Sequence, residues 1–247
     1  MGIVQEMTNP NRLALIPARG GSKGIPRKNL QLVGSISLLE RAISCAIDSG
    51  LFEEICVSTD DEEIAQIARE HGANVPFLRP SELASDESLG IEVIKHAIGF
   101  YVNRGQNFHS LTLLQPTSPF RDIDQVRLAH SIFDSSPFPS LISVLDVSNL
   151  HPSTIYRQMK KISDDCSVIE CIIDNKDLVA GSRRQDFDRQ YWRNGSIYIV
   201  TPDIVMEGQS LLAEPIVSIE MDWIHSINID EPHDLALARR IAVALGI

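Results

Sequence analysis

The stretch Leu13-Ala14-Leu15-Ile16-Pro17-Ala18-Arg19-Gly20-Gly21-Ser22-Lys23-Gly24-Ile25-Pro26-Arg27-Lys28-Asn29-Leu30 joins a short apolar run to a basic, glycine-rich segment. A continuous apolar run of this length is typical of a strand that is buried on both faces. The glycines allow backbone N–H groups to approach an anion closely, and the four cations of the segment can neutralise it. The spacing fits neither GxGxxG nor GxxxxGK[ST], which argues against a dinucleotide-binding turn or a P-loop. The stretch therefore predicts a phosphate-binding loop that follows a first buried strand.

The charge of the chain is unevenly distributed around this loop. The 247 residues include 22 Lys and Arg and 33 Asp and Glu, which gives a formal net charge of −11. No carboxylate occurs between Glu6 and Glu40, and because that interval carries +5, the remainder of the chain carries −16. One of its cations, Arg12, precedes the strand and is expected at the opposite end of the sheet from the loop. The overall acidity argues against a protein that binds nucleic acids or anionic membranes.

Composition and cysteine usage favour a globular cytoplasmic protein. Hydrophobic residues make up 43% of the chain and charged residues 22%, values that argue against global disorder. The apolar runs are too short to span a bilayer, and the N-terminal residues show no secretory signal. Because the four cysteines form no CxxC pair, we expect reduced thiols and a cytoplasmic location.

Strand and helix patterns alternate along most of the chain. Strands are expected at residues 13–16, 55–57, 111–114, 141–147, 197–200 and 216–220. Helices are expected at residues 38–49, 60–68, 91–101, 126–132 and 233–245, the second of them starting with a capping box formed by Asp60 and Glu63. This order predicts an α/β fold with a mostly parallel sheet between helices. Because ligands bind at the carboxyl ends of parallel strands, the basic loop, Asp60 and Gln115 are expected on one rim.

Residues 149–192 depart from this alternation, because they show few helical signals and many short polar breaks. Their own hydrophobic core would be thin, so we interpret them as an extension within a single domain that spans residues 1–247. The rest of the chain has no internal repeat, coiled-coil heptad or low-complexity tract.

Seven further blocks follow the loop in order along the chain. They are VSTDD at 57–61, VPFLRP at 75–80, LASD at 83–86, LQPTSPFR at 114–121, RRQD at 183–186, NGSIY at 194–198 and IDxxxDL at 229–235. Together with the loop, they resemble the acylneuraminate cytidylyltransferases, the CMP-sialic acid synthetases. The resemblance implies a three-layer α/β sandwich of the Rossmann-like nucleotide-diphospho-sugar transferase type. It also implies a homodimer, in which residues 149–192 form a dimerisation extension that reaches the neighbouring subunit's active site.

The reaction that the resemblance implies is transfer of CMP from CTP to the anomeric hydroxyl of a nonulosonic (sialic-type) acid, with Mg²⁺ required and pyrophosphate released. Attack at the α-phosphorus develops negative charge, so cations and a metal ion must surround the triphosphate. Arg19 and Lys23 resemble the family's catalytic, triphosphate-binding residues. The other residues implied to bind the substrates are Ser22 at the triphosphate, Lys28 and Asn29 at the nucleotide, Arg79 and Ser88 at the cytosine, and Gln115 and Arg184 at the sugar. Of these, Arg184 can bind the sugar carboxylate through two hydrogen bonds, which a lysine could not reproduce.

Asp230 matches the acidic residue with which the family holds Mg²⁺. One carboxylate together with phosphate oxygens is a normal arrangement for this ion. An alternative role for Asp230 is to cap the last helix, in whose first turn Asp234 would complement the helix dipole. Asn228 stands where many members have a second aspartate, so it would offer a neutral carbonyl oxygen and lower the metal affinity.

Two other departures from the family pattern lie in regions expected to contact the sugar. Thr154 stands near a position where many members have a lysine, and Trp192 where many have an arginine, with Arg193 displaced by one position. The acceptor is therefore left open, and a legionaminic, pseudaminic or eight-carbon 3-deoxy-2-keto acid is an alternative. A further alternative is a non-catalytic protein that binds CTP or a CMP-sugar, with Asn228 marking a lapsed metal site. The sequence identifies no general base.

Overall fold

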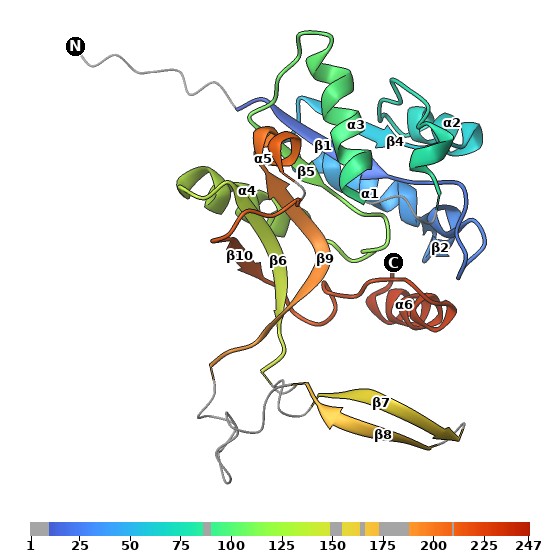
Figure 1. The fold of residues 1–247 in the computed structure, drawn as a ribbon. Coiled ribbons are helices and arrows are strands. Elements are labelled where there is room, and N and C mark those ends of the chain that lie inside the picture. Colours follow the sequence, from blue (N-terminus) through green and yellow to red (C-terminus); the bar gives the residue numbers. More distant parts are fainter. Residues whose placement is uncertain (1–9, 86–89, 149–154, 164–165, 173–187, 209) are drawn as a thin grey trace.

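A computed structural model describes residues 10–85, 90–148, 155–163, 166–172, 188–208 and 210–247 of the chain (Figure 1). Its centre is a six-stranded sheet in the order β10-β6-β9-β5-β1-β4. The strands are β1 (Arg12–Pro17), β4 (Glu54–Ser58), β5 (Ser110–Leu113), β6 (Ser140–Asp146), β9 (Tyr191–Val200) and β10 (Val217–Glu220). Strand β9 runs antiparallel to both of its neighbours, whereas the other adjacent pairs are parallel. The prediction of a mostly parallel sheet is confirmed.

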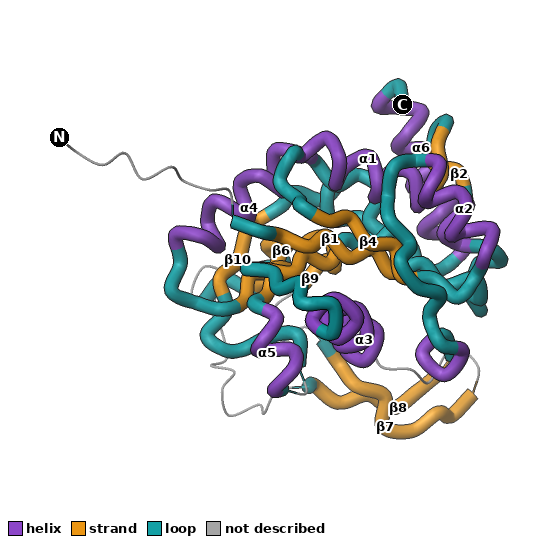
Figure 2. The backbone as a smooth tube through the Cα atoms, turned by 90° about the horizontal axis from the view of Figure 1, so that it is seen from above, coloured by secondary structure: helices purple, strands orange, loops and turns teal. Residues whose placement is uncertain are grey.

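Helices cover both faces of this sheet, as Figure 2 shows. Helices α1 (Leu38–Ser49), α2 (Glu62–Glu70) and α4 (Ile123–Ser135) cover one face, and α3 (Gly90–Val102) and α5 (Pro202–Glu207) cover the other. Successive side chains of β1 point to opposite faces of the sheet, so this strand packs against helices on both sides. Leu13 and Leu15 pack toward α3, whereas Ala14 and Ile16 pack toward α1 and α2. The predicted three-layer α/β sandwich is confirmed.

Helix α2 begins one residue later than its sequence predicts. Its N-cap is Asp61, whose side chain accepts the N–H of Ile64 at 3.0 Å. The prediction that Asp60 starts this helix is wrong, because the Asp60 carboxylate instead accepts the N–H of Gly20 in the basic loop at 2.9 Å. Asp61 therefore caps the helix, whereas Asp60 binds the backbone of the basic loop.

Helix α6 (Pro232–Leu245) packs against a small hairpin formed by β2 (Leu32–Val33) and β3 (Ile36–Ser37). Its N-cap is Glu231, which forms a capping box with Asp234. The alternative that Asp230 caps this helix is therefore wrong, and the Asp230 carboxylate is left for another use. In the described ranges, no helix is both long enough and apolar enough to cross a membrane.

The described part of the extension is an antiparallel hairpin of β7 (Tyr156–Ser163) and β8 (Cys166–Cys171), which stands apart from the central sheet (Figure 1). Tyr191 and Trp192, which the predicted extension included, belong to β9. At the amino end of β1, Arg12 is buried and pairs with Asp134 at 2.6 Å, so it lies away from the basic loop as predicted.

Candidate active site

A cavity of about 750 Å³ opens at the carboxyl ends of β1 and β5. Of the predicted site residues, those that line it are Arg19, Ser22, Lys23, Lys28, Asn29, Arg79, Gln115 and Asp230. Asn228 does not line the cavity but contacts Asp230, and Ser88 and Arg184 lie outside the described residues. The sheet thus brings side chains from distant parts of the sequence to one rim, as the order of strands predicts.

One side of the cavity, which we term the basic wall, consists of Arg19, Ser22, Lys23 and Asn29 from the loop after β1. Asn29 is 7% exposed, and its side-chain amide donates to the carbonyl of Arg19 at 3.0 Å. The guanidinium of Arg19 donates to the carbonyl of Ala84 at 3.4 Å. The loop therefore folds back on itself, and two cations separated by three residues face the same space.

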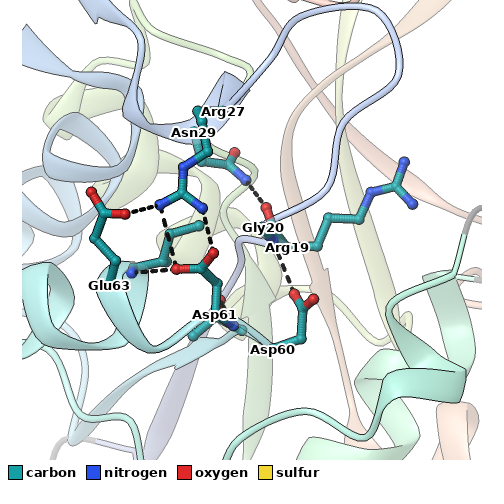
Figure 3. Close-up of polar contacts among 9 residues, drawn as sticks. Arg19, Gly20, Arg27, Asn29, Asp60, Asp61 and Glu63 are labelled. Atoms are coloured by element: carbon teal, nitrogen blue, oxygen red, sulfur yellow. Dashed lines mark hydrogen bonds and ion pairs between the residues drawn. The ribbon is translucent and has the colours of Figure 1, made fainter.

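Arg27 does not belong to the basic wall, which corrects the prediction that all four cations of the loop neutralise the anion. Its guanidinium binds Asp61 and contacts Glu63 at 2.5 Å, whereas Arg19 extends away from this cluster (Figure 3). The hydrogen bond from Arg27 holds the pKa of the Asp61 carboxyl below its usual value. Arg27 therefore fastens the loop to the start of α2 and does not line the cavity.

Gly20 lies against the same pair of aspartates. A Cβ at this position would lie 2.6 Å from Oδ2 of Asp61, so only glycine fits beside that carboxylate. The N–H of Gly20 donates to Asp60, so this amide is already bound and is not one of those left to approach an anion. Of the glycine N–H groups predicted to approach an anion, that of Gly20 is therefore bonded within the protein.

Arg79 contributes to the cavity from the segment after α2, where its backbone N–H donates to the carbonyl of Thr59 at 2.7 Å. It is 6% exposed, its Nε donates to the Ser58 hydroxyl at 3.1 Å, and its Nη2 donates to the Ser58 carbonyl. Burial lowers the pKa of its guanidinium to about 10, so it still carries its charge at neutral pH. Because two of its donors are bound to Ser58, Arg79 is held rigidly at the cavity wall.

A second group of lining residues, which we term the β9 wall, consists of Gln115, Arg193 and Tyr198. The guanidinium carbon of Arg193 lies 5.8 Å from the centre of the Tyr198 ring, within reach of a cation–π contact. Gly195 borders this wall with a φ of 81°, and a Cβ at this position would lie 3.5 Å from Oε1 of Gln115. The β9 wall thus combines a neutral amide, a cation and an aromatic ring in a small space.

Sequence reasoning did not assign Arg193 and Tyr198 to the site. Strand β9 pairs Tyr198 with Ile142 but Arg193 with Val144, so residues 194–197 all lie opposite Ser143. Such an irregularity changes which side chains face which side of the sheet, and a regular alternation cannot predict it. The signal in the sequence that could have identified Arg193 as a site residue was its displacement by one position from the arginine of the family pattern.

Asp230 also lines the cavity. Its carboxylate is 3.2 Å from the Lys28 ammonium and accepts the side-chain amide of Asn228 at 2.6 Å. The Oδ1 atom of Asn228 is buried and has no hydrogen-bond partner. Across the part of the chain that the structure describes, no group of three or more His, Cys, Asp or Glu side chains could hold a metal ion. A metal site here would therefore rest on these two residues and the ligand.

Comparison with known sequences finds one family model and several similar proteins. The sequence model described as Cytidylyltransferase matches residues 13–121, which include β1, the basic loop and Gln115. The CMP-N,N'-diacetyllegionaminic acid synthase of Legionella pneumophila is 36% identical over 236 residues, which cover 93% of this chain and 95% of that protein. The N-acylneuraminate cytidylyltransferases of Escherichia coli and Streptococcus agalactiae are 33% and 30% identical over 92% and 90% of this chain. The chain spans about half the length of these two proteins, 51% of each.

Comparison with solved structures concerns the fold alone, because the identities are low. The CMP:2-keto-3-deoxy-manno-octonic acid synthetase complexed with CTP has a TM-score of 0.67 at 17% identity, covering 96% of this chain and 100% of that one. A 4-diphosphocytidyl-2C-methyl-D-erythritol synthase has a TM-score of 0.62 at 11% identity, covering 96% and 99%. The Legionella relative is 36% identical over 93% of this chain and 95% of its own length. The chain therefore belongs to the cytidylyltransferase family and is a nucleotidyltransferase enzyme.

Proposed function

We propose that the chain transfers CMP from CTP to the anomeric hydroxyl of a nonulosonic acid and releases pyrophosphate. The observation that carries this proposal is one cavity that is lined both by the basic wall and by the β9 wall. A triphosphate requires cations on one side, and a sugar acid requires polar and apolar groups on the other. The names of the relatives, a CMP-legionaminic acid synthase and N-acylneuraminate cytidylyltransferases, support the same reaction here.

In the proposed mechanism, Arg19 and Lys23 bind the triphosphate and balance the charge that develops during the reaction. The anomeric oxygen forms a bond to the α-phosphorus, while the bond to the bridging oxygen breaks and pyrophosphate leaves with the electron pair. Gln115, at the end of β5, orients the acceptor for this attack. The proton of the anomeric hydroxyl passes to solvent or to a phosphate oxygen.

Mg²⁺ is part of this proposal, and the residues present fit the ion. The Asp230 side chain is 66% exposed at the cavity edge, and the buried Oδ1 of Asn228 has no hydrogen-bond partner. Carboxylate and amide carbonyl oxygens are the ligands that Mg²⁺ prefers, usually with substrate phosphates completing its shell. Asp230 and Asn228 would hold the ion, which when bound would neutralise charge on the triphosphate.

N,N'-diacetyllegionaminic acid is a second candidate acceptor beside the sialic acids. The Legionella relative matches this chain over 95% of its own length and with the higher identity, whereas the N-acylneuraminate enzymes extend well beyond the matched part. The cavity also has apolar surface near the β9 wall, from Leu113, Ile94 and Leu211, that suits acyl or methyl groups. The departures at Thr154 and Trp192 agree with an acceptor other than the commonest sialic acid.

We also propose that the β7–β8 hairpin mediates a homodimer. Met159, Ile162 and Ile169 on this hairpin are 57%, 64% and 56% exposed. An isolated two-stranded hairpin is marginal in water, and a second copy would cover these side chains. Light scattering after size exclusion should show a dimer, and I169E should shift it toward monomer. A monomeric unmodified chain at high concentration would contradict this proposal.

A cytoplasmic location completes the proposal. None of the four cysteines, Cys45, Cys56, Cys166 and Cys171, is in a disulfide, and burial raises the pKa of the Cys56 thiol to about 12. Cysteines outside disulfides, two of them buried, are typical of proteins from reducing compartments. Fractionation of cells that produce the chain would test this location.

The reaction is tested by incubating the chain with CTP, Mg²⁺ and one acid at a time, while pyrophosphate is measured. The panel contains N-acetylneuraminic, N,N'-diacetyllegionaminic and pseudaminic acids and an eight-carbon 3-deoxy-2-keto acid. We expect release with at least one nine-carbon acid and none without an acceptor. Release with the eight-carbon acid alone would move the chain to that acceptor class. CTP binding without release from any acid would identify a non-catalytic binding protein.

A further inference from the structure

Arg121, in the turn between β5 and α4, is a buried cation that the proposed mechanism does not use. It is 8% exposed, its Nη2 donates to the carbonyl of Gln115 at 2.7 Å, and its Nε donates to the carbonyl of Ser196 at 2.7 Å. Burial lowers the pKa of its guanidinium, with the Cys45 thiol as a neighbour, and no carboxylate of the described residues forms an ion pair with it. Removing a guanidinium from water is costly unless its donors are bonded. An apolar side chain would fill this space at lower cost, so the two hydrogen bonds need an explanation.

The two carbonyls belong to segments that separate from each other. Strand β5 pairs with β9 as far as Leu113 and Tyr198, and then the chain turns away at Gln115. Strand β9 continues alongside β6, but its pairing is shifted between Tyr198 and Arg193. Ser196 lies in this shifted interval, where the regular ladder is interrupted. The two hydrogen bonds from Arg121, which we term its fork, join these two segments at a place where β5 and β9 are not paired with each other.

We propose that Arg121 is a positioning residue that sets the spacing of the β9 wall and thereby the affinity for the acceptor acid. This inference rests on the proposed function, which places the acceptor at the β9 wall. One end of the fork fixes the backbone of Gln115, whose side chain lines the cavity. The other end fixes Ser196, next to Gly195, at which a Cβ would lie 3.5 Å from Oε1 of Gln115. A lysine donates from one ammonium nitrogen and lacks the rigid planar guanidinium, so it cannot reproduce the two donors that Nε and Nη2 of Arg121 hold in one plane.

The same substitution at a second arginine provides a matched control. Arg127 in α4 also donates to two backbone carbonyls, from Nε to Ser49 at 3.1 Å and from Nη2 to Asp48 at 2.8 Å. These carbonyls lie at the end of α1 and do not line the cavity. Arg127→Lys therefore removes an equivalent fork without touching the β9 wall.

The test measures both Michaelis constants of Arg121→Lys in the full chain. We expect KM for the acceptor acid to rise about tenfold, the effect of one charge-assisted hydrogen bond, with KM for CTP changed by less than about twofold. Arg127→Lys should leave both constants unchanged. An unchanged acceptor KM, or an equal rise in both constants, would overturn the inference. The unmodified chain reports separately on the proposed function, because it must turn over the acid in the same assay.

A measurement on the unmodified chain covers the case in which Arg121→Lys does not fold. The Arg121 Nε–H, bonded to Ser196, gives a side-chain signal that can be followed by ¹⁵N NMR. With a non-reactive CTP analogue already bound, addition of the acceptor acid should shift this signal. The Nε–H signal of Arg127 should stay in place. An Arg121 signal that does not move on acid binding would overturn the inference.

Discussion

The basic wall and the β9 wall line the same cavity, but they are built in different ways. The basic wall comes from one continuous segment, whose ends are held by Asn29 and by the pair of Arg27 with Asp61. The β9 wall is assembled from the turn after β5 and from the irregular part of β9, with Arg121 between them. A substitution in the first wall removes a contact, whereas a substitution in the second changes a distance between segments. The expected size of each effect follows from this difference.

Lys23→Ala should produce the largest effect, because it removes a full charge from the basic wall. We expect kcat/KM for CTP to fall at least about 100-fold, the range found when one charge-stabilising donor is lost. Steady-state kinetics at saturating acceptor measure this loss. Lys95→Ala is the control, since Lys95 lies on α3 and pairs only weakly with Glu92 at 3.7 Å. A loss below about threefold at Lys23 would remove it from the triphosphate site.

Asn228→Asp tests the metal site that we propose at Asp230 and Asn228. A second carboxylate beside Asp230 should strengthen the attraction for a divalent ion, so the half-saturating Mg²⁺ concentration should fall about tenfold. The kcat should stay within about twofold of the original value, because the ion's role is unchanged. Asn103→Asp, which adds the same charge on the exposed end of α3, is the control. A large gain in kcat would instead mark the natural chain as a degenerate enzyme.

The basic wall was largely predictable from the sequence, because its parts are contiguous. The apolar run of β1 and the loop after it place Arg19 and Lys23 at the rim by local geometry alone. Arg27 was misassigned because its partner Asp61 lies 34 residues away, and the composition of the loop does not show which way one cation turns. Asp60 binds the loop at the N–H of Gly20, whereas Asp61 both caps α2 and pairs with Arg27.

The β9 wall could be predicted only in part. Gln115 was found because a polar side chain at the end of a buried strand is hard to explain by packing. Arg193 and Tyr198 were missed because their orientation depends on the shifted pairing opposite Ser143, a property of two strands together. Arg121 was quoted within a family block, but its role depends on carbonyls of residues 115 and 196, which no local pattern relates.

Asp61→Asn should have a smaller effect on the basic wall, because it loosens a support and removes no ligand. Asparagine still caps α2, but its neutral side chain replaces the ion pair with Arg27 by a weaker hydrogen bond. We expect KM for CTP to rise about fivefold with kcat nearly unchanged. Glu62→Gln, which weakens the exposed pair with Arg69 on the same helix, should leave KM unchanged. Because the pKa of Asp61 is lowered, its contribution should persist at neutral pH and be lost only as the pH falls through that lowered pKa.

Gly195→Ala should produce the smallest effect, and it isolates the spacing of the β9 wall. Gly195 has a φ of 81°, so alanine there is strained by about 1 kcal/mol, and its Cβ would also lie 3.5 Å from Oε1 of Gln115. Gly105→Ala is a close control, because Gly105 has a φ of 75° and no atom within 4 Å of the same Cβ position. Thermal unfolding should show a similar loss of stability for both variants.

The two glycine variants should differ in kinetics even though they share the backbone strain. Ordinary van der Waals contact at 3.5 Å restricts the Gln115 amide without displacing it, so KM for the acceptor should rise about threefold in Gly195→Ala alone. KM for CTP should not change in either variant, because the basic wall is held by contacts of its own. If both variants raise the acceptor KM equally, backbone strain and not the contact with Gln115 controls the β9 wall. If Gly195→Ala raises KM for CTP instead, the two walls are coupled and the contrast between them fails.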